Sequence, residues 1–130
     1  MDKKSAVTYW LESSEDDWKS ANIFLKKETM LIHCFLGHLT IEKILKALFV
    51  EKTGNAPPYT HRLVSLSEKV ALKLTDEQLE LLVVITDFNM EARNPDEKFS
   101  FKKKCTRNFT ETYLFKIKEM KEWLLRMIQQ

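Results

Sequence analysis

Apolar side chains recur at intervals of three and four residues along most of the chain, which is the spacing of one face of an α-helix. The pattern predicts five helices, at about residues 7–27, 29–52, 62–72, 75 to 87 or 89, and 106–128. The last of these places apolar residues at alternating steps of four and three, as in a coiled-coil seam. The chain is therefore expected to be mainly helical.

Local signals mark where several of these helices begin and end. The segment 29–52 is apolar around almost its whole circumference, which is typical of a helix at the centre of a core or in a subunit interface. Gly54 follows it and relieves the backbone strain of a helix end, and the prolines after it cannot continue a helix. Thr75 and Gln78 have the spacing of a capping box, so a helix is predicted to begin there.

Two stretches are less clear from the pattern. The run from Leu82 to Thr86 is rich in residues that favour β-structure and by itself is compatible with a buried strand, although its helical flanks favour a helix. Residues 88–104 are interpreted as a long connection, in which Pro95 pushes Asn94 out of helical geometry. A connection of this length in a compact domain is more often functional than accidental.

The composition supports an all-α fold. A chain of 130 residues is the size of one domain, and it holds only two glycines and three prolines. A β-sandwich or barrel needs turn residues at much shorter intervals, so these architectures are disfavoured. We expect a single domain over residues 1–130, built as an up-and-down bundle of about five helices. Three long helices would form its body and the two shorter ones would close it.

The start of the chain and its cysteines indicate a compartment. Residues 1–4 lead into charged sequence rather than into the apolar region of a signal peptide, and no stretch approaches 18 consecutive apolar residues. The protein is therefore expected to be soluble and cytoplasmic. Cys34 and Cys105 lie 71 positions apart and are expected to be inert, reduced thiols rather than a disulfide or a metal site.

Charge is distributed unevenly along the chain. Residues 1–97 carry 12 basic and 16 acidic side chains, whereas residues 98–130 carry 9 basic and 3 acidic ones. The basic segment has two interpretations. It can attract phosphates, RNA or an acidic partner, or it can be a solvated helix face beside the acidic part of its own fold.

Several classes of catalysis lack their sequence motifs. There is no HExxH and no histidine and cysteine framework for zinc, and His33 and His38 are five residues apart, so they lie on different faces of a helix. With only two glycines in the chain, a glycine-rich phosphate loop cannot be built, which excludes nucleotide-dependent phosphoryl transfer by this chain alone. No metal and no cofactor is expected.

The most informative polar residues lie on the apolar second helix. His38 and Glu42 are four residues apart and share a face, and Lys46 follows one turn later. An unpaired charge on such a helix is costly, so these groups need partners or an aqueous cleft. They form either a structural network within the bundle or a ligand-facing cluster that His61 and Arg93 complete.

Three short motifs together resemble a known family. Residues 38–48 read HLTIEKILKAL, residues 59–63 read YTHRL, and residues 92–96 read ARNPD. In this order they resemble the HEPN family, whose name stands for higher eukaryotes and prokaryotes nucleotide-binding, and the likeness extends from about residue 7 to residue 128. The resemblance implies a bundle of about five helices that often dimerises. Many bacterial members are encoded beside a small nucleotidyltransferase, in a toxin–antitoxin-like pair, and others are metal-independent ribonucleases.

The sequence departs from the ribonuclease members. Those proteins use an arginine followed four to six residues later by a histidine, whereas here all three histidines precede all four arginines. A second departure is Asn94, where the family usually has tyrosine. We therefore expect a non-catalytic nucleotide- or partner-binding protein, homodimeric and with a small nucleotidyltransferase as its candidate partner.

The expected ligand site is a polar cleft between the second and fourth helices, lined by His38, Glu42, Lys46, His61 and Arg93. Arg93 and Lys46 would bind a phosphate, with His61 as an orienting donor. Two alternatives remain open. One is a metal-independent ribonuclease with a non-standard site formed by His61 and Arg93. The other is a purely structural helical interaction module, anchored by exposed aromatic residues among Trp10, Trp18, Tyr113 and Trp123.

Overall fold

The computed structural model describes residues 2–23 and 29–128, and the regular secondary structure of this part is entirely helical. In chain order the helices are α1 (Lys3–Ala21), α2 (Met30–Thr53), α3 (Leu63–Lys69), α4 (Asp76–Arg93), α5 (Pro95–Lys104) and α6 (Arg107–Ile128). The all-α helical bundle expected from the sequence is confirmed, with six helices in place of about five. The predicted end of the first helix, residues 24–27, lies outside the described residues.

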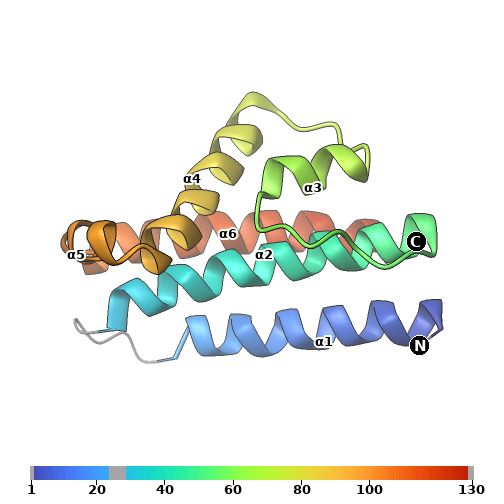
Figure 1. Ribbon diagram of the computed structural model, residues 1–130, viewed down its shortest axis with the longest axis horizontal. Helices are drawn as coiled ribbons and strands as arrows, with labels where there is room; N and C mark the ends of the chain where they lie inside the picture. The colour runs from blue at the N-terminus through green and yellow to red at the C-terminus, as the bar shows by residue number, and fades with distance from the viewer. Residues whose placement is uncertain (1, 24–28, 129–130) are drawn as a thin grey trace.

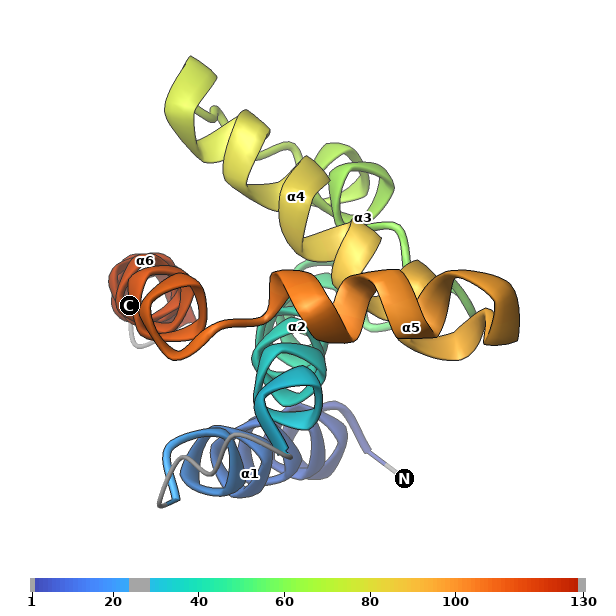
Figure 2. The same cartoon turned by 90° about the vertical axis from the view of Figure 1, so that its left-hand side faces the viewer.

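Helix α2 is the centre of the bundle. Figures 1 and 2 show α1 along one side of α2, α6 along a second, and α3 and α4 over a third. Helix α1 runs antiparallel to α2, and the chain returns through α4 and α5 so that α6 starts at the same end as α2 (Figure 1). This central position explains why α2 is apolar on nearly every face.

Close contact between α2 and α6 depends on a small residue. A Cβ atom at Gly37 of α2 would lie 2.8 Å from Cδ1 of Ile117 on α6, which is closer than real contacts of this kind. The glycine therefore lets the two helices approach one another. Between α1 and α2, the Ser14 hydroxyl donates a hydrogen bond of 2.9 Å to the carbonyl of Thr40, and Lys43 forms an ion pair of 2.7 Å with Asp17.

All six helices contribute to the core, as do two of the segments that join them. Its largest fully buried apolar side chains are those of Phe101, Ile41, Ile44, Leu45, Leu48, Leu63, Leu66, Leu82, Ile85, Ile117 and Leu124. Burial of this apolar surface is the main force that holds the helices together. Among the described residues, no helix combines the length and the apolar character that crossing a membrane requires.

The helix ends agree with the local signals in the sequence. Gly54 ends α2 in the left-handed region with φ of 73°. The capping box at α4 is complete, since the Thr75 hydroxyl accepts from the Gln78 amide at 3.1 Å and the Gln78 side chain accepts from the Thr75 amide at 3.0 Å. The run from Leu82 to Thr86 is helical, so the strand alternative is excluded.

The predicted connection over residues 88–104 is wrong. Helix α4 continues to Arg93, and α5 occupies Pro95–Lys104. The geometric expectation at Asn94 is confirmed, because this residue is extended, with φ of −87° and ψ of 115°. The error was to interpret Pro95 as a sign of a loop. Proline is also favoured at the first position of a helix, where its missing amide hydrogen would have no partner in any case.

Candidate functional site

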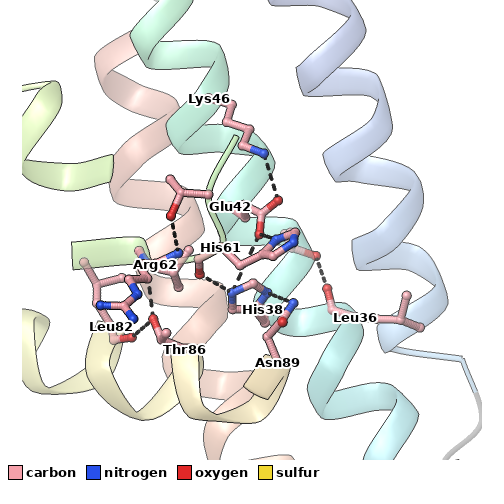
Figure 3. A network of polar contacts seen from close by, with 12 residues as sticks. Leu36, His38, Glu42, Lys46, His61, Arg62, Leu82, Thr86 and Asn89 are labelled. Atoms are coloured by element: carbon pink, nitrogen blue, oxygen red, sulfur yellow. Dashed lines mark hydrogen bonds and ion pairs between the residues drawn. The ribbon is translucent and has the colours of Figure 1, made fainter. Parts of the chain in front are cut away.

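Glu42 is the centre of a buried network of polar side chains. Only 4% of this residue is exposed, and both of its carboxylate oxygens are bonded. Oε1 accepts a hydrogen bond of 2.8 Å from Nδ1 of His61, and Oε2 accepts one of 3.1 Å from Nζ of Lys46 (Figure 3). A buried carboxylate without such partners would be strongly destabilising. The hydrogen bonds from His61 and Lys46 therefore compensate for the burial of Glu42.

Two segments of the chain build this network. His38, Glu42 and Lys46 follow one another at four-residue steps, which aligns them along one side of α2. His61 comes from the extended segment between α2 and α3 (Figure 3). The turn that Gly54 makes possible at the end of α2 brings this segment back along the helix.

His38 anchors the main chain of His61 through a hydrogen bond. Its Nε2 lies 3.0 Å from the carbonyl oxygen of His61, and because a carbonyl only accepts, Nε2 must carry the hydrogen. The other ring nitrogen, Nδ1, is then an acceptor, and the amide group of Asn89 on α4 donates to it at 3.3 Å. His38 therefore ties together α2, the segment before α3, and α4.

His38 is neutral at neutral pH. Burial lowers its pKa to about 4, and the electrostatic influence of His61 and Arg93 acts in the same direction, against the opposing effects of the His61 carbonyl and of the Glu42 carboxylate. The distance of 3.8 Å between Nε2 of His38 and Oε1 of Glu42 is thus a contact with a neutral ring rather than an ion pair. The i,i+4 spacing of these two residues places them on one side of α2, as expected.

His61 is held at two points and still reaches solvent. Its carbonyl is bonded to His38 and its Nδ1 to Glu42, while 25% of its side chain is exposed. Within the described residues, no hydrogen bond is formed by its Nε2. Because Nδ1 donates to Glu42, Nε2 is a proton acceptor in the neutral ring and a donor to an anion in the protonated ring.

The other two cations of the predicted site lie in different settings. Lys46 is 5% exposed and directed to Glu42, so it is enclosed and not open to solvent. Arg93, at the end of α4, is exposed, and its guanidinium lies 5.9 Å from the centroid of the Phe35 ring. The structure thus brings His38, Glu42, Lys46 and His61 into one network, and it places Arg93 near enough for its charge to act on His38.

Sequence reasoning missed Asn89, which is fully buried and links α4 to the network. A signal for it was present, since Asn89 is in helical phase with Leu82 and Ile85 and is therefore a polar residue at a core position. Its Oδ1 has no hydrogen-bond partner among the described residues. Such an atom is a place where a donor from outside the chain, such as water, fits.

The two cysteines lie together in the core. Cys34 and Cys105 are both buried, and Sγ of Cys34 lies 3.6 Å from the hydroxyl of Thr110. The contact with Cys34 and burial raise the pKa of the Cys105 thiol, which disfavours the reactive thiolate. In the described part of the chain, no group of three histidine, cysteine, aspartate or glutamate residues is arranged to hold a metal ion.

A groove lies away from the polar network. This groove, of about 560 Å³, lies between the first half of α4 and residues 113–126 of α6. Tyr113 and Trp123, both half-buried, are among its walls, whereas none of the five predicted site residues lines it. The residues that line it are Thr75, Glu77, Gln78, Glu80, Leu81, Val84, Tyr113, Lys116, Glu119, Met120, Trp123 and Arg126.

The fold and the site define an all-helical domain with a charged network buried beside its central helix. The model of the HEPN domain family matches residues 7–128, so the chain belongs to the HEPN domain family. The match covers nearly the whole chain and agrees with the extent of the resemblance seen in the sequence. Comparison with curated proteins and comparison with solved structures found no match.

Proposed function

We propose that this protein is a non-catalytic HEPN-family binding protein that binds the phosphate of a nucleotide, free or within RNA, beside His61 and Arg93. One observation carries the proposal. The network holds His61 at its carbonyl and at Nδ1, and it leaves Nε2 without a hydrogen bond among the described residues on a side chain that is 25% exposed. In the protonated ring this nitrogen donates to a phosphate oxygen. The exposed guanidinium of Arg93 supplies the permanent charge.

The roles of the other network residues follow from their burial. Lys46 is paired with Glu42 and enclosed, so we assign it the role of balancing that carboxylate rather than of contacting phosphate. Glu42 orients the His61 ring, and His38 positions the His61 backbone. All three are positioning residues, and the contacts to the ligand are made by His61 and Arg93.

Calorimetric titration with adenosine monophosphate (AMP) tests this function. We expect the wild type to bind, and we expect Arg93→Ala to weaken binding at least tenfold, because the charge-assisted bond to the phosphate is lost. Arg126→Ala is the matched control, since Arg126 is an exposed arginine on α6 and lines the groove. Absence of binding, or equal affinity in the wild type and Arg93→Ala, contradicts the proposal.

A further part of the proposal concerns the cellular location, the oligomeric state and the partner of the protein. We propose that it acts in the cytoplasm as a homodimer and as the partner subunit of a small nucleotidyltransferase, in a toxin–antitoxin-like pair. The support is membership of the HEPN family, in which such pairs occur. A gene for a small nucleotidyltransferase beside this one, followed by co-purification of the two chains, is the expected result. A monomer by light scattering contradicts the dimer.

Metal-independent RNA cleavage is a second candidate function, and one observation favours it. The Glu42 carboxylate orients His61 at 2.8 Å and leaves Nε2 unbonded, as in a general base that a carboxylate positions. Incubation of the pure protein with total RNA in EDTA decides between binding and cleavage. Cleavage that disappears in His61→Ala supports the ribonuclease, and intact RNA supports the binding protein.

A helical interaction module is the third candidate, favoured by the groove between α4 and α6. Its walls include Trp123 and Tyr113, which are the kind of large side chains that anchor interfaces. If this is the main function, Trp123→Ala abolishes capture of the nucleotidyltransferase subunit and leaves AMP binding unchanged. If the first proposal holds, Arg93→Ala has the larger effect on AMP binding.

A further inference from the structure

Four aromatic rings gather at the surface where the polar network ends. Tyr9 and Trp10 belong to α1, and their ring centroids lie 5.2 Å apart in an edge-to-face arrangement. Tyr59 and His61 belong to the segment between α2 and α3, and their centroids lie 5.8 Å apart, also edge to face. We refer to Tyr9, Trp10, Tyr59 and His61 as the aromatic cluster.

Lys46 connects the two halves of the cluster. Its ammonium nitrogen lies 5.3 Å from the centroid of the Trp10 ring and 5.9 Å from that of the Tyr59 ring. Because Lys46 is itself fixed by Glu42, these cation–π contacts join α1 and the segment before α3 to one buried ion pair. The rings therefore have defined positions rather than being independent surface side chains.

Tyr59 is the most exposed member, and its backbone is firmly held. The residue is 91% exposed, and it follows Pro57 and Pro58, whose rings restrict φ. Immediately after it, the Thr60 amide donates to the Pro58 carbonyl at 3.1 Å, and the His61 carbonyl accepts from His38 at 3.0 Å. The chain thus presents a phenol ring to solvent on a structured segment, beside the proposed phosphate-binding residue.

We propose that the aromatic cluster is a stacking platform for an unpaired nucleobase, presented by a free nucleotide or by single-stranded RNA. Every nucleobase has a π-face that stacks on tyrosine, tryptophan or histidine, and this contact needs no particular sequence. Tyr9 is 52% exposed and Tyr59 is 91% exposed, so each has ring surface available for a base. The inference rests on the proposed function, because the phosphate of the same ligand is bound by His61 and Arg93.

The position of Trp10 provides a direct reporter. The chain has three tryptophans, and replacing Trp18 and Trp123 by phenylalanine leaves Trp10 as the only one. In this background we expect AMP to quench the fluorescence of Trp10, because the base approaches the cluster. Ribose 5-phosphate has the same sugar and phosphate but no base, and it is expected to bind without quenching.

Substitutions at Tyr59 isolate the base contact. We expect Tyr59→Ala to weaken AMP binding about tenfold and to leave the affinity for ribose 5-phosphate unchanged, whereas Tyr59→Phe retains most of the AMP affinity. The matched control is Phe115→Ala, which removes an aromatic ring that is 63% exposed on α6. Because Tyr59 is exposed, its replacement leaves the folded core intact, and the thermal unfolding midpoint of each variant checks this.

The outcomes separate this inference from the function on which it rests. If AMP and ribose 5-phosphate bind with equal affinity in the wild type and in Tyr59→Ala, the stacking platform is overturned and the phosphate site stands. If neither compound binds, both proposals fail. A single-stranded oligonucleotide that binds more tightly than AMP, with the same dependence on Tyr59, identifies RNA as the source of the base, and equal affinity identifies the free nucleotide.

Discussion

The buried network around Glu42 and the groove between α4 and α6 are organised in different ways. In the network, the charged groups of Glu42 and Lys46 are enclosed and each has a named partner. Around the groove, the charged residues at the rim, among them Glu80 and Arg126, form no ion pair with another described residue, and the apolar side chains form the walls. Removal of one charged group from the network therefore leaves its partner buried and unpaired. Removal of such a charged side chain at the groove rim leaves no unpaired partner, because that side chain has no ion-pair partner in the described part of the chain.

The largest expected effect follows from breaking the network at its centre. Glu42→Ala leaves the buried ammonium of Lys46 without its carboxylate, which is expected to lower the free energy of unfolding by about 3–5 kcal/mol. Glu80→Ala at the groove rim is the matched control and is expected to change it by less than about 0.5 kcal/mol. Urea denaturation of both variants is the measurement, and equal effects would remove the distinction between the two regions.

The pH dependence of stability provides the next test of the network. The unfolded chain protonates His38 near its ordinary pKa of 6.5, whereas the folded protein does so only near pH 4. Between these values the unfolded state binds more protons, so stability falls as the pH is lowered from 6.5 to 4, by about 3 kcal/mol in total from this residue.

The His38→Gln variant isolates this contribution. Its side chain has no titrating group, so the difference between its stability and that of the wild type should shrink or change sign as the pH falls through this window. Two parallel curves of unfolding free energy against pH would show that His38 is not held in its neutral form.

A smaller effect is expected at the groove. Trp123 is half-buried, so Trp123→Ala removes only part of the apolar contact that a core tryptophan makes, and we expect a loss of about 1–2 kcal/mol. Thermal and urea unfolding measure this loss. A loss as large as that of Glu42→Ala would mean that the groove wall is part of the core.

The smallest predicted effect concerns the start of α4, which forms one wall of the groove. Thr75→Ala removes the hydroxyl that accepts from the Gln78 amide and is expected to lower stability by about 1 kcal/mol. Because this half of α4 borders the groove, the loss should appear in hydrogen exchange as faster opening near Gln78. Exchange near Asn89, at the network end of α4, should be unchanged, and faster exchange there would contradict the local origin of the effect.

The features that could be predicted from the sequence are those that neighbouring residues determine. The capping box of Thr75 and Gln78 involves atoms three residues apart, and it set the start of α4 correctly. The end of α2 at Gly54 was likewise a local signal. Helix α5 was missed because a proline has two local meanings, loop residue and first residue of a helix, and the choice depends on packing elsewhere in the fold.

The candidate site was predictable in composition but not in arrangement. The four-residue spacing of His38, Glu42 and Lys46 indicated one shared face of α2, and the structure contains these residues in one network with His61. The sequence could not show that the Lys46 ammonium lies against the Trp10 ring, because Trp10 is on another helix and far from it along the chain. The contact of Asn89 with His38, across 51 positions, was equally hidden.

The central claim is that the network fixes His61 with Nε2 unbonded at the surface, and ¹⁵N nuclear magnetic resonance of the histidine rings tests it most directly. In His61 the hydrogen must lie on Nδ1, which donates to Glu42, whereas in neutral His38 it must lie on Nε2, which donates to the His61 carbonyl. We expect the two rings to show these opposite patterns, and His61 to lose its pattern in Glu42→Ala, which offers no acceptor to Nδ1. A neutral His61 with its hydrogen on Nε2 in the wild type would contradict the account.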